Sequence, residues 1–120
     1  MNSNRLADEI SQIILTKKGY DTKILDLRKL TTIADYFVIC SADSDIQVKA
    51  ISDEIEKKLG EKGIKCYHRE GDKSLRWVLM DYFDVIAHIF HNEARSFYNL
   101  EKLWGDAPSK LVEDELSSSQ

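Results

Sequence analysis

The feature that most constrains the fold is a strand-like run that passes directly into a capped amphipathic helix. Residues 34–42, ADYFVICSA, are rich in aromatic and β-branched side chains and favour a strand. Ser44 and Gln47 follow at capping-box spacing, which marks the start of a helix. One apolar stripe then runs down that helix through Val48, Ile51, Ile55 and Leu59. A strand continued by such a helix predicts a sheet with a helical crossover.

The other segments supply the remaining layers of this architecture. The spacing of their apolar residues predicts helices at about 3–17 and 92–104 and strands at 22–28, 64–70, 75–83 and 85–91. Asn92 is a plausible N-cap of the last helix, and Phe97, Tyr98 and Leu103 are expected on its inner side. The order α-β-β-α-β-β-β-α predicts an α/β (α+β) fold with three helices on a mixed sheet of about five strands.

The length of 120 residues predicts one domain, which we place at residues 1–108. Pro108 ends the last helix, and residues 109–120 are polar, acidic and poor in core material. We expect this segment to be a disordered tail. Cys40 and Cys66 lie in apparent strands without metal-ligand spacing, so they are expected to be buried free thiols.

Charge and hydropathy restrict the partners and the location of the chain. The formal net charge is −4, from 17 basic and 21 acidic residues, and no dense basic stripe is present. Direct binding to DNA or another nucleic acid is therefore not expected, because such binding depends on clustered Lys and Arg. No apolar run approaches the length of a membrane span and the N-terminus lacks a signal-peptide layout. We expect a cytoplasmic protein that does not bind membranes.

The stretch 77–91, WVLMDYFDVIAHIFH, carries acids and imidazoles that could suggest an active site. Asp81 and Asp84 are three residues apart, so in one strand they would point to opposite faces; a turn between two strands suits them better. His88 and His91 have the same spacing, and neither has a Cys or His near it to complete a zinc set. The sequence therefore predicts no catalytic set, no metal and no cofactor.

Trp77 is the more informative residue of this stretch. In the run Arg76–Tyr82, one face takes Trp77, Leu79 and Asp81 and the other Val78, Met80 and Tyr82, so from Trp77 onward every position except Asp81 is apolar or aromatic. Such a strand is either covered by helices on both sides or presents one face to a partner. The residue pattern leaves both interpretations open, although Trp, Tyr and Met are enriched at binding hot spots.

Two long stretches resemble a known family. DYFVICSADSDIQVKAISDEI (35–55) and EGDKSLRWVLMDYFDVIAHIFHNEARSFYNLEKLWGDA (70–107) are similar to the ribosomal silencing factors of the RsfS, or Iojap, family. The likeness extends from the first helix to Pro108 and excludes the acidic tail. Two positions depart from the usual family wording: Ala42 and Phe83 stand where Gly is frequent.

The resemblance implies a non-enzymatic function. Family members bind the fourteenth protein of the large ribosomal subunit, block its joining to the small subunit and repress translation when nutrients are short. The family fold is similar to that of nucleotidyltransferases without their catalytic residues, and this sequence has no Gly-Ser followed by an Asp-x-Asp strand. A homodimer is a further implication. For partner binding we predict Trp77, Leu79 and Tyr82 as anchors, Asp81 and Asp84 as acidic contacts, and Tyr36 and Glu93 as weaker candidates.

Two alternatives stay open at the level of the sequence. The first is an assembly factor that binds the same ribosomal protein earlier, as organellar relatives of the family do. The second belongs to another class: a nucleotidyltransferase-like enzyme in which Asp43, Asp45 or Asp81 holds a magnesium ion.

Overall fold

The computed structural model describes residues 1–112 of the chain. Its helices and strands follow one another as α1 (Ser3–Thr16), β1 (Tyr20–Asp26), β2 (Tyr36–Ala42), α2 (Asp45–Glu61), β3 (His68–Glu70), β4 (Trp77–Asp81), β5 (Val85–His91), α3 (Asn92–Tyr98), α4 (Leu100–Leu103) and β6 (Ser109–Val112). None of the helices in this part of the chain is long and apolar enough to cross a membrane.

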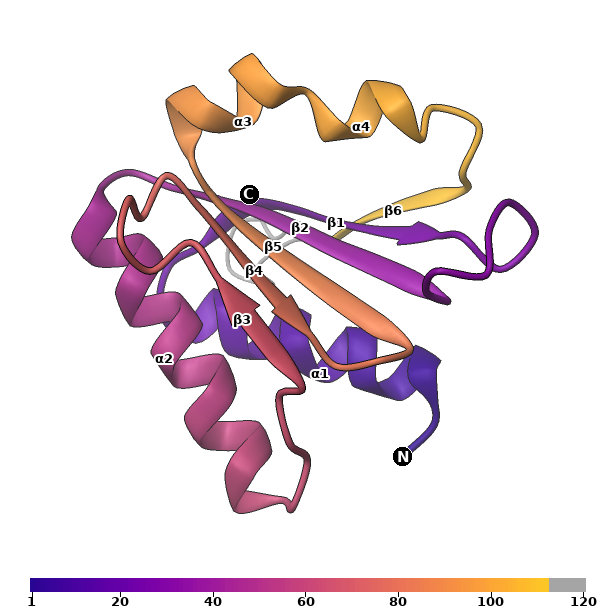
Figure 1. Cartoon of the computed structure of the whole chain (residues 1–120), viewed down its shortest axis with the longest axis horizontal. Helices are drawn as coiled ribbons and strands as arrows, with labels where there is room; N and C mark the ends of the chain where they lie inside the picture. Colours follow the sequence, from indigo (N-terminus) through magenta and orange to yellow (C-terminus); the bar gives the residue numbers. More distant parts are fainter. Residues whose placement is uncertain (113–120) are drawn as a thin grey trace, which may run out of the picture.

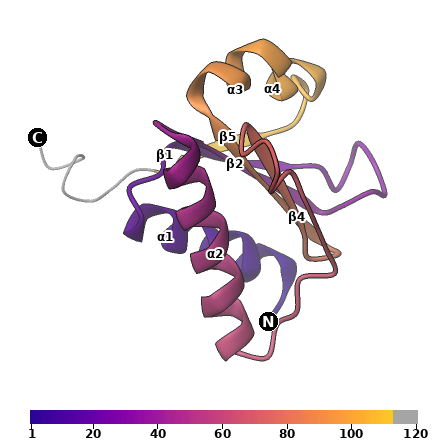
Figure 2. The ribbon, with the colours of Figure 1, turned by 60° about the vertical axis from the view of Figure 1, so that its left-hand side comes forward.

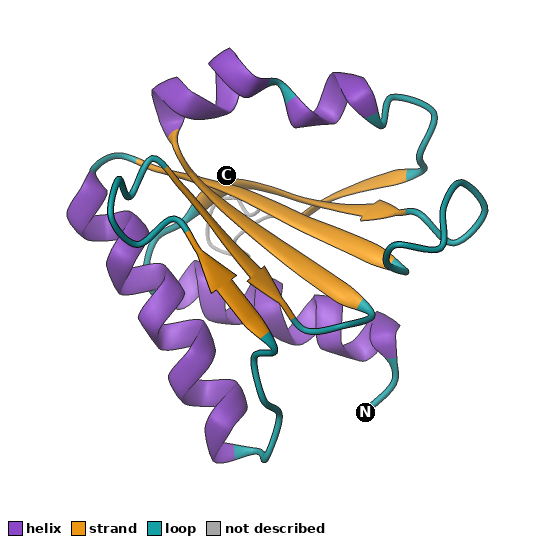
Figure 3. Ribbon diagram, in the orientation of Figure 1, coloured by secondary structure: helices purple, strands orange, loops and turns teal. Residues whose placement is uncertain are grey.

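The strands form a single mixed sheet in the order β3-β4-β5-β2-β1-β6 (Figure 3). β2 and β5 are parallel, and the other neighbouring pairs are antiparallel. Helix α2 carries the chain from the centre of the sheet to its edge at β3, and β4 and β5 bring it back to β2. The predicted α+β fold with a helical crossover is thereby confirmed.

Helices lie on both sides of the sheet. α1 and α2 cover one face, whereas α3 and α4 lie over the other (Figures 1 and 2). Strand β2 is buried along its whole length because its alternate side chains enter the two cores: Tyr36, Val38 and Cys40 the α1–α2 core, and Phe37 and Ile39 the α3–α4 core. This double burial explains why the strand reads as a continuous apolar run.

The capping box expected at the start of α2 is present. The Ser44 hydroxyl accepts the backbone N–H of Gln47 at 3.1 Å, and the side-chain oxygen Oε1 of Gln47 reaches back to accept the backbone N–H of Asp43 at 2.7 Å. The Gln47 amide also donates to the carbonyl oxygens of Lys17 and Lys18, just after α1. One side chain therefore starts α2 and fixes it against the end of the first helix.

The C-terminal boundary differs from the prediction. Residues 109–112 form β6, which pairs antiparallel with β1, so the sheet has a sixth strand and the expected disordered tail is wrong for these four residues. The rest of the predicted tail lies outside the described residues. Ser109 and Lys110 carry no apolar signal; the strand forms because β1 offers an unpaired edge to it.

Two other elements are shorter than predicted. The strand expected at 64–70 covers only His68–Glu70, so Cys66 lies before it and is half-buried, unlike the fully buried Cys40. The last helix, expected at 92–104, is broken at Asn99, which has left-handed backbone angles (φ 50°, ψ 51°). Asn tolerates this conformation better than most residues. The N-cap of α3 is His91 rather than Asn92.

Candidate partner-docking surface

The α3–α4 face of the sheet is incompletely covered at its β3–β4 edge. Trp77 and Leu79 of β4 are half-buried there, on the same face as Phe90 and His88, their cross-strand partners in β5. Asp81 shares this face, because side chains alternate along a strand. The structure thus brings together Trp77, Leu79 and Asp81, three of the residues predicted for partner binding.

Trp77 is held in a defined orientation by its neighbours. Its indole stacks on the Phe90 ring at a centroid separation of 4.9 Å and lies 5.0 Å from the Tyr98 ring of α3. The indole N–H donates to His88 Nδ1 at 3.1 Å. A large aromatic side chain that is fixed yet partly exposed loses little conformational entropy when it binds a partner.

The acceptor of that hydrogen bond is itself fixed by burial. His88 is 3% exposed, and burial lowers its pKa to about 3, so its imidazole is neutral near neutral pH. The Phe37 ring packs against it at a centroid separation of 4.5 Å. The packed position expected for His88 is confirmed. Its Nδ1 fixes the direction of the Trp77 indole through the hydrogen bond.

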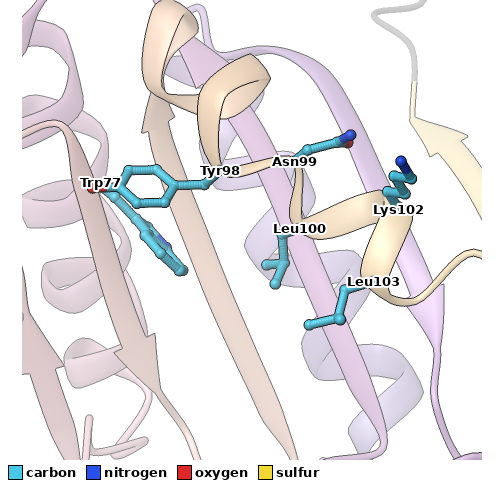
Figure 4. A pocket seen from close by; sticks show the side chains of 6 residues that line it. All are labelled: Trp77, Tyr98, Asn99, Leu100, Lys102 and Leu103. Atoms are coloured by element: carbon cyan, nitrogen blue, oxygen red, sulfur yellow. The ribbon is translucent and has the colours of Figure 1, made fainter.

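Helices α3 and α4 complete an open apolar groove beside Trp77. The groove has a volume of about 580 Å³ and is lined by Trp77, Tyr98, Asn99, Leu100, Lys102 and Leu103; we call it the docking groove. Figure 4 shows the Tyr98 ring beside Trp77, with Leu100 and Leu103 turned away from the Asn99 and Lys102 side chains. Tyr98 and Leu103 are 53% and 75% exposed. A second hollow, lined in part by Phe97, adjoins it at Tyr98.

The contribution of these helices was missed by the sequence reasoning. Phe97, Tyr98 and Leu103 were expected to face inward, but among the seven residues of α3 only Ala94 is buried, and α4 buries none. The break at Asn99 changes the helical phase, and both helices are too short to bury a full stripe. The adjacent Phe97–Tyr98 pair was the available signal.

Acidic side chains lie on or next to the sheet face that carries Trp77 and Leu79. The Asp81 carboxylate accepts the backbone N–H of Phe83 at 2.7 Å, which confirms its expected place at the turn between β4 and β5. Asp84, at the end of that turn, is exposed. Glu93 is also exposed and lies 3.9 Å from Arg76. Glu70, which the sequence reasoning did not select, pairs with Leu79 and therefore shares its face.

Tyr82 and Tyr36 do not belong to this surface. They are 4% and 6% exposed, and both pack in the α1–α2 core on the opposite face of the sheet. Strand alternation places Tyr82 on the face opposite Trp77, so the two cannot contact one partner together. We therefore remove Tyr82 from the predicted anchors and Tyr36 from the weaker candidates.

The turn that carries Asp81 and Asp84 has an unusual backbone. Phe83 has a φ of 74°, in the left-handed region, and its side chain is 69% exposed. The only ring beside it is that of Tyr67 within the described residues, at a centroid separation of 5.6 Å. A glycine suits this backbone better, which explains physically why a departure from Gly at this position matters.

The carboxylates considered for magnesium binding are separated by the fold. Asp43 follows the C-terminal end of β2 and accepts the Tyr20 hydroxyl at 2.7 Å. Asp81 pairs with Ile86, which lies next to Phe37 at the opposite end of β2. Six residues of extended strand separate positions 37 and 43, or roughly 20 Å. Among residues 1–112, no three His, Cys, Asp or Glu side chains are grouped as metal ligands would be.

Solved structures share the whole fold. A crystal structure from Chromobacterium violaceum matches with a TM-score of 0.85 at 31% identity, over 95% of each chain. A crystal structure from Bacillus halodurans matches with a TM-score of 0.81 at 35% identity, over 92% of this chain and 100% of that one.

Sequence comparisons give the family. The profile described as "Ribosomal silencing factor during starvation" matches residues 1–120. The ribosomal silencing factor RsfS of Bacillus subtilis is 50% identical over 92 residues, covering 77% of this chain and 78% of that protein. The protein of the same name from Halalkalibacterium halodurans is 40% identical over 117 residues, covering 98% and 100%. The resemblance noted in the sequence is confirmed: this chain belongs to the RsfS family of ribosomal silencing factors.

Proposed function

We propose that this protein silences ribosomes by binding the fourteenth protein of the large subunit through the docking groove. The bound domain then occupies surface that the small subunit needs, so the two subunits cannot join and translation falls under nutrient limitation. The proposal places the protein in the cytoplasm, with the ribosomes. Membership of the RsfS family supports the general role, and the groove supplies a surface suited to it.

The observation that carries the proposal is the held, partly exposed indole of Trp77 at the edge of an open apolar groove. Binding energy concentrates in a few aromatic anchors surrounded by contacts that exclude water. Trp77, Tyr98 and Leu103 provide such anchors on one side of the molecule. Steric exclusion then needs only an interface of standard size, roughly 800 Å² on each partner.

The charges around the groove favour a basic partner. Glu70, Asp81, Asp84 and Glu93 outnumber Arg76 and Lys102 on the surface described above. Carboxylates at a rim raise the association rate with a cationic surface and discriminate against acidic ones. A basic ribosomal protein matches this arrangement.

The separation of Asp43 from Asp81 argues against a magnesium site shared by these two carboxylates, because such a site requires carboxylates that converge. The assembly-factor alternative uses the same surface. It predicts that precursor large subunits accumulate in cells that lack the protein, whereas a silencing factor leaves mature subunits that join freely.

Trp77→Ala tests the proposed site. The variant should bind purified large subunits at least about 2 kcal/mol, or roughly thirtyfold, more weakly than the wild type, because it removes the central anchor. Binding is measured by co-sedimentation with large subunits. Adding small subunits to the same mixtures shows whether joining is still blocked.

Two further variants keep this test specific. Trp77→Phe retains a ring to stack on Phe90 but loses the indole N–H, so its affinity should be intermediate. Ile46→Ala removes an apolar side chain that is 82% exposed on α2, and it should bind like the wild type. If folded Trp77→Ala binds with unchanged affinity, the groove is not the site. If bound wild-type protein lets subunits join freely, the silencing mechanism is overturned.

A further inference from the structure

The short helix α4 forms part of the docking groove with little apolar anchoring of its own, because only Leu100 of its residues packs, partly buried, against the α3–α4 core. It has four residues, none of them buried, and it follows the left-handed Asn99. A helix this short is not stable by itself. Its position relative to Trp77 therefore depends on further contacts besides the packing of Leu100 and of Trp104 just after the helix.

Those contacts are ionic and come from the side of α4 away from the groove. The two Glu101 carboxylate oxygens accept from different cations: Oε1 from Arg95 Nε at 2.8 Å and Oε2 from Lys23 Nζ at 2.9 Å. We call Lys23, Arg95 and Glu101 the Glu101 clamp. The hydrogen bond from Arg95 is the main cause that lowers the pKa of Glu101 to about 2, so the carboxylate is charged at neutral pH.

Arg95 fixes the clamp to the sheet. Its Nη1 donates to the Asp21 carbonyl oxygen at 2.6 Å and to the Ser41 hydroxyl at 2.9 Å, at the beginning of β1 and the end of β2. Its side chain is only 11% exposed. The clamp thus joins α3, α4, β1 and β2 at one point, through polar contacts of defined direction.

The clamp and the docking groove lie on either side of Asn99, which joins α3 to α4 and which we call the Asn99 hinge. A polar hollow of about 570 Å³ contains Lys23, Arg95 and Glu101 in its lining, and Asn99 lines both this hollow and the groove. Tyr98 and Leu100, the neighbours of Asn99, are groove residues. A rotation at Asn99 would therefore move Leu100 and Leu103 relative to Trp77.

We propose that Arg95 and Glu101 are positioning residues for partner binding, which set the shape of the docking groove by fixing α4 across the Asn99 hinge. This inference rests on the proposed docking function of the groove. The clamp residues do not line the groove, so they act through the placement of Leu100 and Leu103. A groove fixed before binding has less conformational entropy to lose when a partner docks.

The first experiment examines the protein alone. Glu101→Gln should speed amide hydrogen exchange at Lys102 and Gly105, whose N–H groups donate to the carbonyl oxygens of Asn99 and Lys102. Amide exchange in β2 should stay unchanged. Glu61→Gln is the matched control: it also removes one carboxylate from an ion pair, but in the exposed α2 pair with Lys58. Equal exchange in the two variants would show that the clamp does not hold α4.

The second experiment measures binding to large subunits by co-sedimentation. Glu101→Gln should weaken binding by about fivefold or more, with little loss of global stability in urea unfolding. Glu61→Gln, which changes net charge equally, should leave affinity unchanged. The double variant with Arg95→Met and Glu101→Gln should lose less binding free energy than the sum of the two single losses, because both side chains act through the same clamp. If Arg95→Met does not fold, the Glu101→Gln result alone decides.

The outcomes separate this inference from the proposed function. If Trp77→Ala loses binding while Glu101→Gln keeps full affinity, the groove is the site and the positioning role is overturned. If Trp77→Ala retains full affinity, the docking function itself fails. A loss of affinity in Glu101→Gln that Glu61→Gln reproduces would indicate long-range charge effects and would also overturn the positioning role.

Discussion

At the scale of single residues, the pairing of Trp77 with His88 joins the core to the proposed binding surface. His88 is buried and neutral, with its Nδ1 bound to the indole N–H, so Nε2 carries the imidazole proton. Nε2 has no hydrogen-bond partner within the described residues. A buried donor without an acceptor costs stability.

The burial of His88 predicts how stability depends on pH. In the unfolded chain this histidine binds a proton near pH 6.5, whereas in the folded protein it does so only near pH 3. Between these values the unfolded state holds more protons, so the free energy of unfolding falls as pH falls. From pH 7 to pH 5 His88 should account for a loss of about 2 kcal/mol.

Urea unfolding at pH 7 and pH 5 measures this loss. His88→Phe should show a smaller decrease, because it removes the titrating group. Equal decreases in the wild type and His88→Phe would contradict a buried, neutral His88.

At the scale of elements, the turn between β4 and β5 contains an aspartate that favours the turn and a phenylalanine whose backbone conformation is unfavourable. Asp81 accepts the N–H of Phe83, as a turn aspartate should, yet Phe83 itself has a φ of 74°. A side chain with a Cβ is disfavoured in this region, by about 1 kcal/mol or more. The turn therefore forms against the preference of Phe83, because the two strands it joins are packed in the sheet.

Phe83→Gly should raise the free energy of unfolding by about 0.5–1 kcal/mol, since glycine adopts positive φ without strain. This expected gain in stability is small because the variant also loses the ring contact with Tyr67. Phe83→Ala loses the same contact but keeps a Cβ, so it should show no gain. Urea unfolding of the three proteins compares them, and a gain in Phe83→Ala equal to that in Phe83→Gly would disprove the strain.

At the scale of the whole molecule, the sheet extends one strand beyond the predicted domain. β6 covers the edge of β1 through four paired positions, and Val112 packs against the α1–α2 core. The backbone N–H of Asp26 also donates to the carbonyl oxygen of Pro108 at 2.8 Å. The folded unit therefore includes residues 109–112.

A chain that ends at Pro108 should be about 2 kcal/mol less stable than one that ends at Val112, because the hydrogen bonds of β6 are lost. It should also self-associate more, since the edge of β1 is then uncovered. Urea unfolding and sedimentation velocity measure the two effects. Identical unfolding midpoints for the two chains would show that β6 adds nothing to the folded unit.

Local sequence patterns were sufficient to predict a helix or strand where that element buries an apolar stripe of its own. The strand at Tyr36–Ala42 and the helix at Asp45–Glu61 were predicted because their burial, capping and spacing are all written in neighbouring residues. β6 could not be predicted in this way, since it depends on hydrogen bonds to β1 from the other end of the chain. The break at Asn99 was missed for a related reason: Asn permits a left-handed backbone but does not require one.

The sequence by itself determined the order of the elements as far as α3, the family, and the candidate anchors Trp77 and Leu79, because these follow from local periodicity and contiguous motifs. Only the tertiary structure decided which apolar and aromatic residues face solvent: Tyr82 and Tyr36 enter the core, whereas Tyr98 and Leu103 line the groove. The physical reason is that exposure depends on which layer lies opposite a side chain. That layer is assembled from segments distant in the chain: Lys23 of β1, for example, donates to Glu101 of α4.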